Sequence, residues 1–146
     1  MGGRGASSGM GGGNPNSPEG RNAYNIEMEN ARSFEAAFVL DSNTTKDAIG
    51  YQMYVHEDVT GRSLIADTRK EIEMDRRALK EANSMGKSYG MSDDAIAGMK
   101  KGIQEKISLK EKAIDKMQSA KDQYEKYKKQ AFIGSEKSKR RKGNWM

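Results

Sequence analysis

The sequence contains no cysteine and only one histidine, His56. Without thiols the chain can form no disulfide bond and no thiolate metal site, and a lone histidine excludes multi-histidine metal centres. No apolar run approaches the roughly 18 residues of a membrane span, and residues 1–20 lack the apolar stretch of a signal peptide. These absences predict a soluble, cytoplasmic protein with no metal or cofactor.

Large apolar side chains are also scarce. Leu, Ile, Val and Phe together occupy 19 of 146 positions, fewer than an ordinary core requires. Ten Met and six Tyr residues partly fill this deficit. Charged residues make up 32% of the chain, but acids and bases are interspersed and the net charge is only +5, which argues against a wholly disordered chain. The composition favours one small domain of marginal stability, or one that a partner completes.

Glycine and proline are concentrated at the N-terminus. Residues 1–20 hold eight of the 16 glycines and both prolines. Such a segment buries too little surface to offset its backbone entropy, so we predict that residues 1–20 are disordered. Ser17 followed by Pro18 could nevertheless cap a short helix that starts here.

The pattern between residues 34 and 57 favours a β-hairpin. An apolar run over 34–40 is followed by a loop-like segment over 41–46. Apolar residues then occupy every second position, at Ile49, Tyr51, Met53 and Val55. A period of two is typical of a strand, so we predict a short β-hairpin. The run over 34–40 would also suit one face of a helix.

From residue 62 onward the spacing becomes helical. Ile65, Ile72 and Leu79 recur every seven residues, which predicts a helix over 62–84 that ends near the following glycines. Ser92 is a natural N-cap for a second helix over 92–133. This helix carries one seven-residue repeat through Ile96, Ile103, Met117, Tyr124 and Ala131, and Gly134 is expected to end it.

The predicted fold is therefore mainly α. A long antiparallel helical hairpin, 62–84 against 92–133, packs beside the short β-hairpin, and both termini are disordered. A single domain covers 21–134. The second helix is longer than the first can cover, so the apolar stripe near its end needs another cover: the β-hairpin, a second copy of the chain or a different protein.

The C-terminal segment, 135–146, is a basic tail with five positive charges in six residues. Clustered Lys and Arg attract nucleic-acid phosphate, and aromatic residues can stack on bases. The alternative is a solvated terminus that aids solubility. The predicted partner-binding residues combine these basic and aromatic side chains with those at the end of the second helix: Tyr124, Tyr127, Lys128, Lys129, Lys137, Lys139, Arg140, Arg141, Lys142 and Trp145.

No converging catalytic set is visible. His56 lies opposite the apolar face of the predicted strand, which favours a solvent-facing or packing role. Gly86-Lys87-Ser88 is similar to the end of a phosphate-binding loop, but position 81 holds Glu where that loop needs Gly. Glu71-Ile-Glu73 resembles the paired glutamates of ADP-ribosyltransferases, although a mid-helix pair is better explained as a solvated face. We therefore predict that the chain is not an enzyme.

The opening residues, Met1-Gly-Gly-Arg-Gly-Ala-Ser-Ser-Gly, resemble the Gly-Arg-Ser-rich start of small proteins from phages and prophages of low-GC Gram-positive bacteria. The resemblance implies a virion component or an inhibitor of host defence, a group that includes anti-CRISPR proteins. Our hypothesis is a non-enzymatic, phage-encoded protein that binds and inhibits a host nucleic-acid-handling complex. The alternatives are a virion or assembly protein that forms a homo-oligomer, and a nonspecific nucleic-acid-binding protein.

Overall fold

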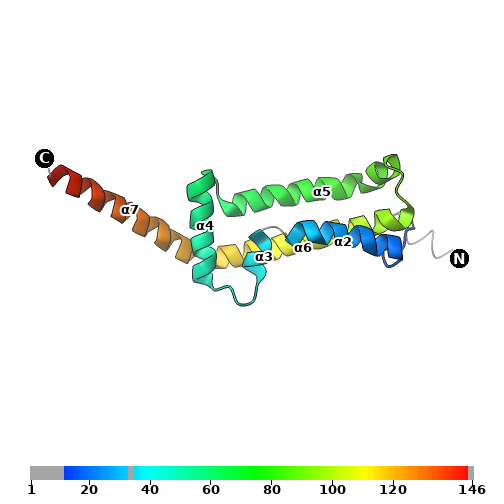
Figure 1. The fold of residues 1–146 in the computed structure, drawn as a ribbon, viewed down its shortest axis with the longest axis horizontal. Helices are drawn as coiled ribbons and strands as arrows, with labels where there is room; N and C mark the ends of the chain where they lie inside the picture. Colours follow the sequence, from blue (N-terminus) through cyan, green and yellow to red (C-terminus); the bar gives the residue numbers. More distant parts are fainter. Residues whose placement is uncertain (1–11, 33–34, 145–146) are drawn as a thin grey trace.

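The computed structural model describes residues 12–32 and 35–144, the side chains of residues 30, 32 and 135–144 excepted. This part of the chain contains six α-helices and no strand (Figure 1). The mainly α class is therefore confirmed. The helices are α2 (Pro18–Arg32), α3 (Glu35–Leu40), α4 (Lys46–Thr60), α5 (Leu64–Ser88), α6 (Asp93–Ser119) and α7 (Lys121–Asn144).

Helix α6 is the central element. Helices α2 and α5 run alongside it, α4 crosses near its C-terminal end, and α7 extends beyond α4 (Figure 1). The predicted antiparallel hairpin is present as α5 and α6. The prediction of one continuous helix over 92–133 was wrong, because the chain bends at the fully buried Ala120 and continues as α7.

The ends of the hairpin helices follow from capping. The Ser92 hydroxyl accepts a hydrogen bond from the backbone N–H of Ala95 at 3.1 Å, as expected for an N-cap. The turn before it depends on Gly90, whose φ of 77° is left-handed. Gly86, by contrast, lies in the last turn of α5 and keeps a helical backbone, without a positive φ. A Cβ there would come within 2.5 Å of the Ile96 side chain, so this glycine allows α5 and α6 to approach closely.

The predicted β-hairpin over 34–57 is wrong, because its described residues, from 35 onward, form α3, a short turn and most of α4. The Thr45 hydroxyl caps α4 by accepting from the N–H of Ala48 at 3.1 Å. The buried side chains of α4, Ile49 and Met53, lie four residues apart on one helical face, whereas Tyr51 is 54% exposed. The alternation therefore matched a strand only by including residues that lie on other faces of the helix.

The predicted disorder of residues 1–20 is also wrong for the described part, 12–20, which packs against α6. The N–H of Asn14 donates to Asp94 Oδ1 at 2.8 Å, and the N–H of Gly20 donates to Ser17 Oγ at 3.1 Å, so Ser17 does cap α2. The glycines of this segment allow close packing of the backbone, in addition to the conformational freedom from which disorder was predicted. A Cβ at Gly98 would lie 1.8 Å from the carbonyl oxygen of Gly20, so α2 and α6 meet backbone to backbone.

The C-terminal segment is likewise more regular than predicted. Gly134 does not end the helix, and the backbone of residues 135–144 continues α7 instead of forming an irregular tail. A single glycine in a helix costs only about 1 kcal/mol relative to alanine, which is too little to stop it. Residues 1–11 and 145–146 lie outside the described residues.

A charged cluster joins α2, α5 and α6. Lys110 of α6 is buried, and its Nζ lies 2.7 Å from Asp75 Oδ2 and 3.3 Å from Glu71 Oε1, both on α5. Lys106 Nζ lies 2.8 Å from Glu27 Oε1 of α2. Burial raises the pKa of Glu71 above its ordinary value, and the charge of Lys110 offsets part of this rise. The cluster therefore fixes where α2 and α5 lie along α6.

The contact between α2 and α6 predicts a large effect of one added methyl group. Gly98→Ala should lower the free energy of unfolding by about 2 kcal/mol or more, because the new Cβ overlaps the Gly20 backbone. Gly134→Ala is the matched control, since a Cβ there meets nothing within 4 Å. The control should be neutral or raise stability by about 0.5–1 kcal/mol. Urea unfolding followed by circular dichroism measures both, and equal stability of Gly98→Ala and wild type would contradict the close contact.

Candidate functional site

Most of the predicted partner-binding residues lie on the part of α7 that projects from the bundle (Figure 1). Helix α7 packs against α4 near its start, and every residue from 128 to 134 is exposed. We call residues 128–144 the α7 arm. At a rise of about 1.5 Å per residue, the arm is about 25 Å long.

The joint between α4 and α7 holds the base of this arm. Gly50 of α4 allows the crossing, since a Cβ there would lie 2.7 Å from Gln123 Cβ and 2.8 Å from the backbone nitrogen of Tyr124. Tyr124 is buried, and its hydroxyl donates a hydrogen bond to Glu57 Oε2. Lys128 Nζ lies 3.3 Å from the other oxygen of Glu57. One carboxylate therefore contacts two successive turns of α7.

The predicted aromatic residues differ in how far they are exposed. Tyr124 is 8% exposed, so its ring is part of the core and cannot stack on a ligand. Tyr127 is partly buried, and its ring centroid lies 5.6 Å from that of Tyr51, with the planes at 75°. Tyr51 is not among the predicted site residues, because the alternating pattern places it in a strand. Trp145 lies outside the described residues.

The basic character of the chain is concentrated in α7. This helix carries nine Lys and Arg against three Asp and Glu, a net charge of +6. The remaining residues carry 17 basic against 18 acidic side chains, a net charge of −1. Lys129 is exposed, and the structure describes only the backbone for the basic residues of the last turns. These are Lys137, Lys139, Arg140, Arg141 and Lys142.

The arm also exposes two large apolar side chains. Phe132 is 66% exposed and Ile133 is 43% exposed. Both lie on the part of α7 beyond the joint with α4. The arm therefore offers apolar as well as cationic groups to a partner.

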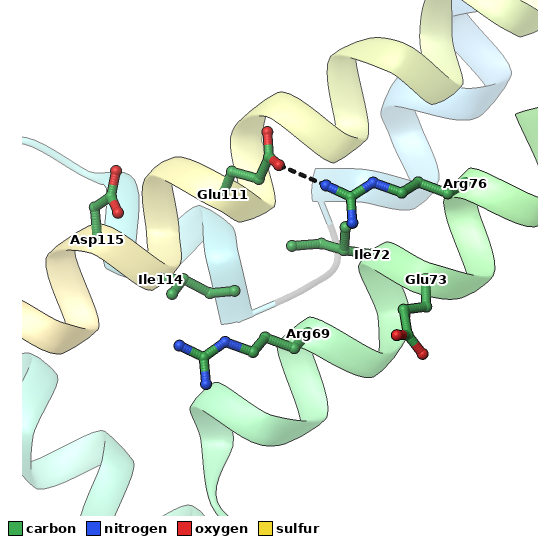
Figure 2. Close-up of a pocket in the computed structure, with 7 residues that line it drawn as sticks. All are labelled: Arg69, Ile72, Glu73, Arg76, Glu111, Ile114 and Asp115. Atoms are coloured by element: carbon green, nitrogen blue, oxygen red, sulfur yellow. Dashed lines mark hydrogen bonds and ion pairs between the residues drawn. The ribbon is translucent and has the colours of Figure 1, made fainter.

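A groove of about 390 Å³ lies between α5 and α6 (Figure 2). Ile72 and Ile114 line its apolar part, and Arg76 Nη2 lies 2.8 Å from Glu111 Oε2 across it. The rim mixes both signs of charge, so it does not select a charged ligand of either sign. Glu73 is exposed on α5 and points away from the Arg76–Glu111 pair, as Figure 2 shows.

The other residues considered for chemistry have structural partners. Glu71 is paired with Lys110, so the two glutamates compared with ADP-ribosyltransferases do not converge on one site. Residues 86–88 form the last turn of α5, whereas a phosphate-binding loop follows a strand. Within the described ranges, no group of His, Asp or Glu could hold a metal ion.

His56 links α4 to α5. Its Nε2 lies 2.8 Å from Asp67 Oδ2, and Arg62 Nε donates to the other oxygen of Asp67 at 3.1 Å. The hydrogen bond with His56 holds the pKa of Asp67 below its ordinary value of 3.8, and Arg62 acts in the same direction. The His56 side chain is only 12% exposed, so of the two predicted roles, solvent-facing or packing, the structure shows packing.

The chain matches no protein-family model, no curated protein and no solved structure. In the part of the chain that the structure describes, no helix combines the length and the apolar character needed to cross a bilayer. The features on which a function can be proposed are therefore the projection of the α7 arm, its charge and its joint with α4.

The pairing of Asp67 predicts a pH-dependent stability. Since the folded-state pKa of Asp67 lies below 3.8, its contribution is present above pH 3.8 and is lost as the pH falls through the folded-state value. Asp67→Asn should therefore be less stable than wild type at pH 7, and the difference should shrink below pH 3.8. Urea unfolding at a series of pH values measures this. Asp58→Asn, at an exposed position of α4, is the control and should follow the wild-type profile; a constant Asp67→Asn difference would contradict the pairing.

Proposed function

We propose that this chain is a non-enzymatic binding protein that contacts the phosphate backbone of nucleic acid through the α7 arm. The observation that carries the proposal is the concentration of a net charge of +6 on α7, whose greater part projects beyond the bundle. Lys and Arg that neutralise phosphates release counterions, which gives affinity that is independent of sequence and falls with salt. The rest of the molecule, at a net charge of −1, supplies no comparable attraction.

The narrower proposal is inhibition of a host nucleic-acid-handling complex by a phage-encoded protein. The resemblance of residues 1–9 to small phage proteins supports the phage origin, and anti-CRISPR proteins are one group with such a role. The shape supports the mode of action. An arm about 25 Å long can contact the nucleic acid of a nucleoprotein complex while the bundle behind it blocks access.

Removal of residues 135–146 tests the first proposal. The truncated chain lacks five Lys and Arg and one Glu. Its affinity for a labelled DNA duplex should fall by about tenfold or more at moderate salt. The slope of log K against log salt concentration should fall by about 0.9 for each phosphate that the truncated chain no longer neutralises. Fluorescence anisotropy at several salt concentrations measures both quantities.

A matched control removes charge elsewhere. Arg77, Lys80 and Lys87 are exposed on α5, and their combined replacement by Gln should change the affinity and the slope much less per charge removed. Equal effects per charge would show that net charge alone governs binding. A truncated chain that binds as tightly as wild type, with the same slope, would refute the role of the arm.

The second candidate function is self-association as a virion or assembly protein. The exposed side chains of Phe132 and Ile133 on the arm favour it, because adjacent large apolar groups on a projecting helix can pair with a second copy. Ile103, in contrast, is 4% exposed inside the bundle, so its substitution would unfold the monomer and not test this function.

For this candidate we expect a stable oligomer that Phe132→Asp converts to a monomer. Light scattering coupled to size-exclusion chromatography measures the mass. Ala131→Asp places the same charge on a neighbouring exposed position and serves as the control. A wild-type mass equal to that of one chain, at all concentrations tested, would exclude the assembly function.

A further inference from the structure

Three tyrosines gather where the α7 arm leaves the bundle. The ring of Tyr51 lies edge to face with that of Tyr127, with centroids 5.6 Å apart, and lies 6.4 Å from the ring of Tyr54 at 41°. Tyr51 is 54% exposed. We call these three residues the tyrosine platform. Single exposed apolar side chains are common, but a group of aromatic rings at the base of a cationic helix is a specific combination.

The platform is held by the joint between α4 and α7. Gly50 precedes Tyr51 and brings the α4 backbone against Gln123 and Tyr124. Tyr124, less than one turn before Tyr127, is fixed by burial and by its hydrogen bond to Glu57. Because the supporting backbone is packed on both helices, presenting these rings to a ligand costs little conformational entropy.

We infer that the tyrosine platform stacks unpaired bases, so that the ligand of the α7 arm is single-stranded nucleic acid. This inference rests on the proposed phosphate-binding function of the arm. Proteins that bind single strands without sequence preference combine a cationic track for the backbone with aromatic rings for the bases. The chain has both, in adjoining positions: nine Lys and Arg on α7, and the ring of Tyr51 beside its base.

A duplex can contact the cationic arm but not the tyrosine platform. Its bases are stacked on one another, so their faces are not available to Tyr51, and only its phosphates can engage the arm. An acidic polypeptide likewise offers charge to the arm and no base to the rings. The half-exposed Tyr51 ring therefore selects a single strand among the polyanions.

The test compares binding of single-stranded and double-stranded DNA to the full chain. The probes are labelled oligothymidine of about 20 nucleotides and a duplex of the same length, with fluorescence anisotropy as the readout at constant salt. Wild type should bind the single strand more tightly. Tyr51→Ala should weaken single-strand binding by about tenfold and leave duplex binding unchanged. Tyr51→Phe, which keeps the ring, should bind as wild type does.

Tyr89→Ala is the matched control. Tyr89 is 77% exposed next to the turn between α5 and α6, at the end of the bundle opposite to α7 (Figure 1). This variant should bind both probes as wild type does. Urea unfolding of each variant shows whether it is folded at the temperature of the binding measurement. Should Tyr51→Ala be unfolded, Tyr51→Leu tests the ring's role, because it keeps a large apolar side chain without the aromatic ring.

The outcomes separate this inference from the function on which it rests. Equal salt-dependent binding of both probes, unchanged in Tyr51→Ala, would overturn the platform and leave the phosphate-binding arm intact. Equal weakening of both probes by Tyr51→Ala would assign Tyr51 to the joint and also overturn the platform. Displacement of the single strand by polyglutamate, as effective as by unlabelled oligothymidine, would overturn it too. Binding of neither probe would overturn both proposals.

Discussion

The pairing of Lys106 and Lys110 with carboxylates on two neighbouring helices governs how the bundle is assembled. The chain has few large aliphatic residues, so α6 covers part of its surface with the methylene groups of these lysines. A buried ammonium group must be paired, because an uncompensated charge in the interior is strongly destabilising. Asp75 of α5 meets this requirement for the buried Lys110, and Glu27 of α2 pairs with the partly buried Lys106 one turn earlier on α6. The positions of α2 and α5 along α6 follow from it.

Close backbone contact is the second constraint, and it accounts for much that the sequence could not reveal. Capping residues and seven-residue repeats were enough to predict the hairpin of α5 and α6, because both signals are local. Glycine is ambiguous in this respect. Gly90 ends a helix through its left-handed backbone, whereas Gly86 and Gly98 lie within helices and allow a neighbour to approach. Nothing in the local sequence distinguishes the two uses. The disorder predicted for residues 1–20 is wrong over 12–20 because Gly13 and Gly20 pack closely against α6.

The β-hairpin was mispredicted for a related reason. Residues 49–55 alternate like a strand, but the Thr45 cap and the left-handed Gly61 enclose a helix whose buried face needs only Ile49, Gly50 and Met53. The capping pattern at Thr45 was the local signal that could have corrected the assignment. The cover that the apolar stripe of the last helix required is therefore α4, from within the same chain.

For the candidate site, the sequence reveals where the charge lies but not how the aromatic residues are placed. The basic residues from Lys137 to Lys142 can be located from composition alone. Tyr124 and Tyr127 share a helix and a periodicity, yet the first is an anchor in the core and the second lies beside an exposed ring. The difference depends on the crossing of α4 over α7, where Glu57 and Tyr124 meet from positions 67 residues apart in the sequence. Local sequence patterns do not reveal this crossing, so they could not predict that Tyr51 lies beside Tyr127.

Helix α7 is attached to the bundle only near its start, so a small change in its angle there moves its far end by a large distance. Its 24 residues span about 36 Å, so a tilt of about 10° at Ala120 would move the far end by about 6 Å. The buried Tyr124 and the paired Glu57 lie close to Ala120, where a small change in packing would displace the far end of α7 the most. A ligand that touched the joint as well as the arm would restrict that swing. Its contacts near Ala120 would then set the reach of every cation farther along the helix.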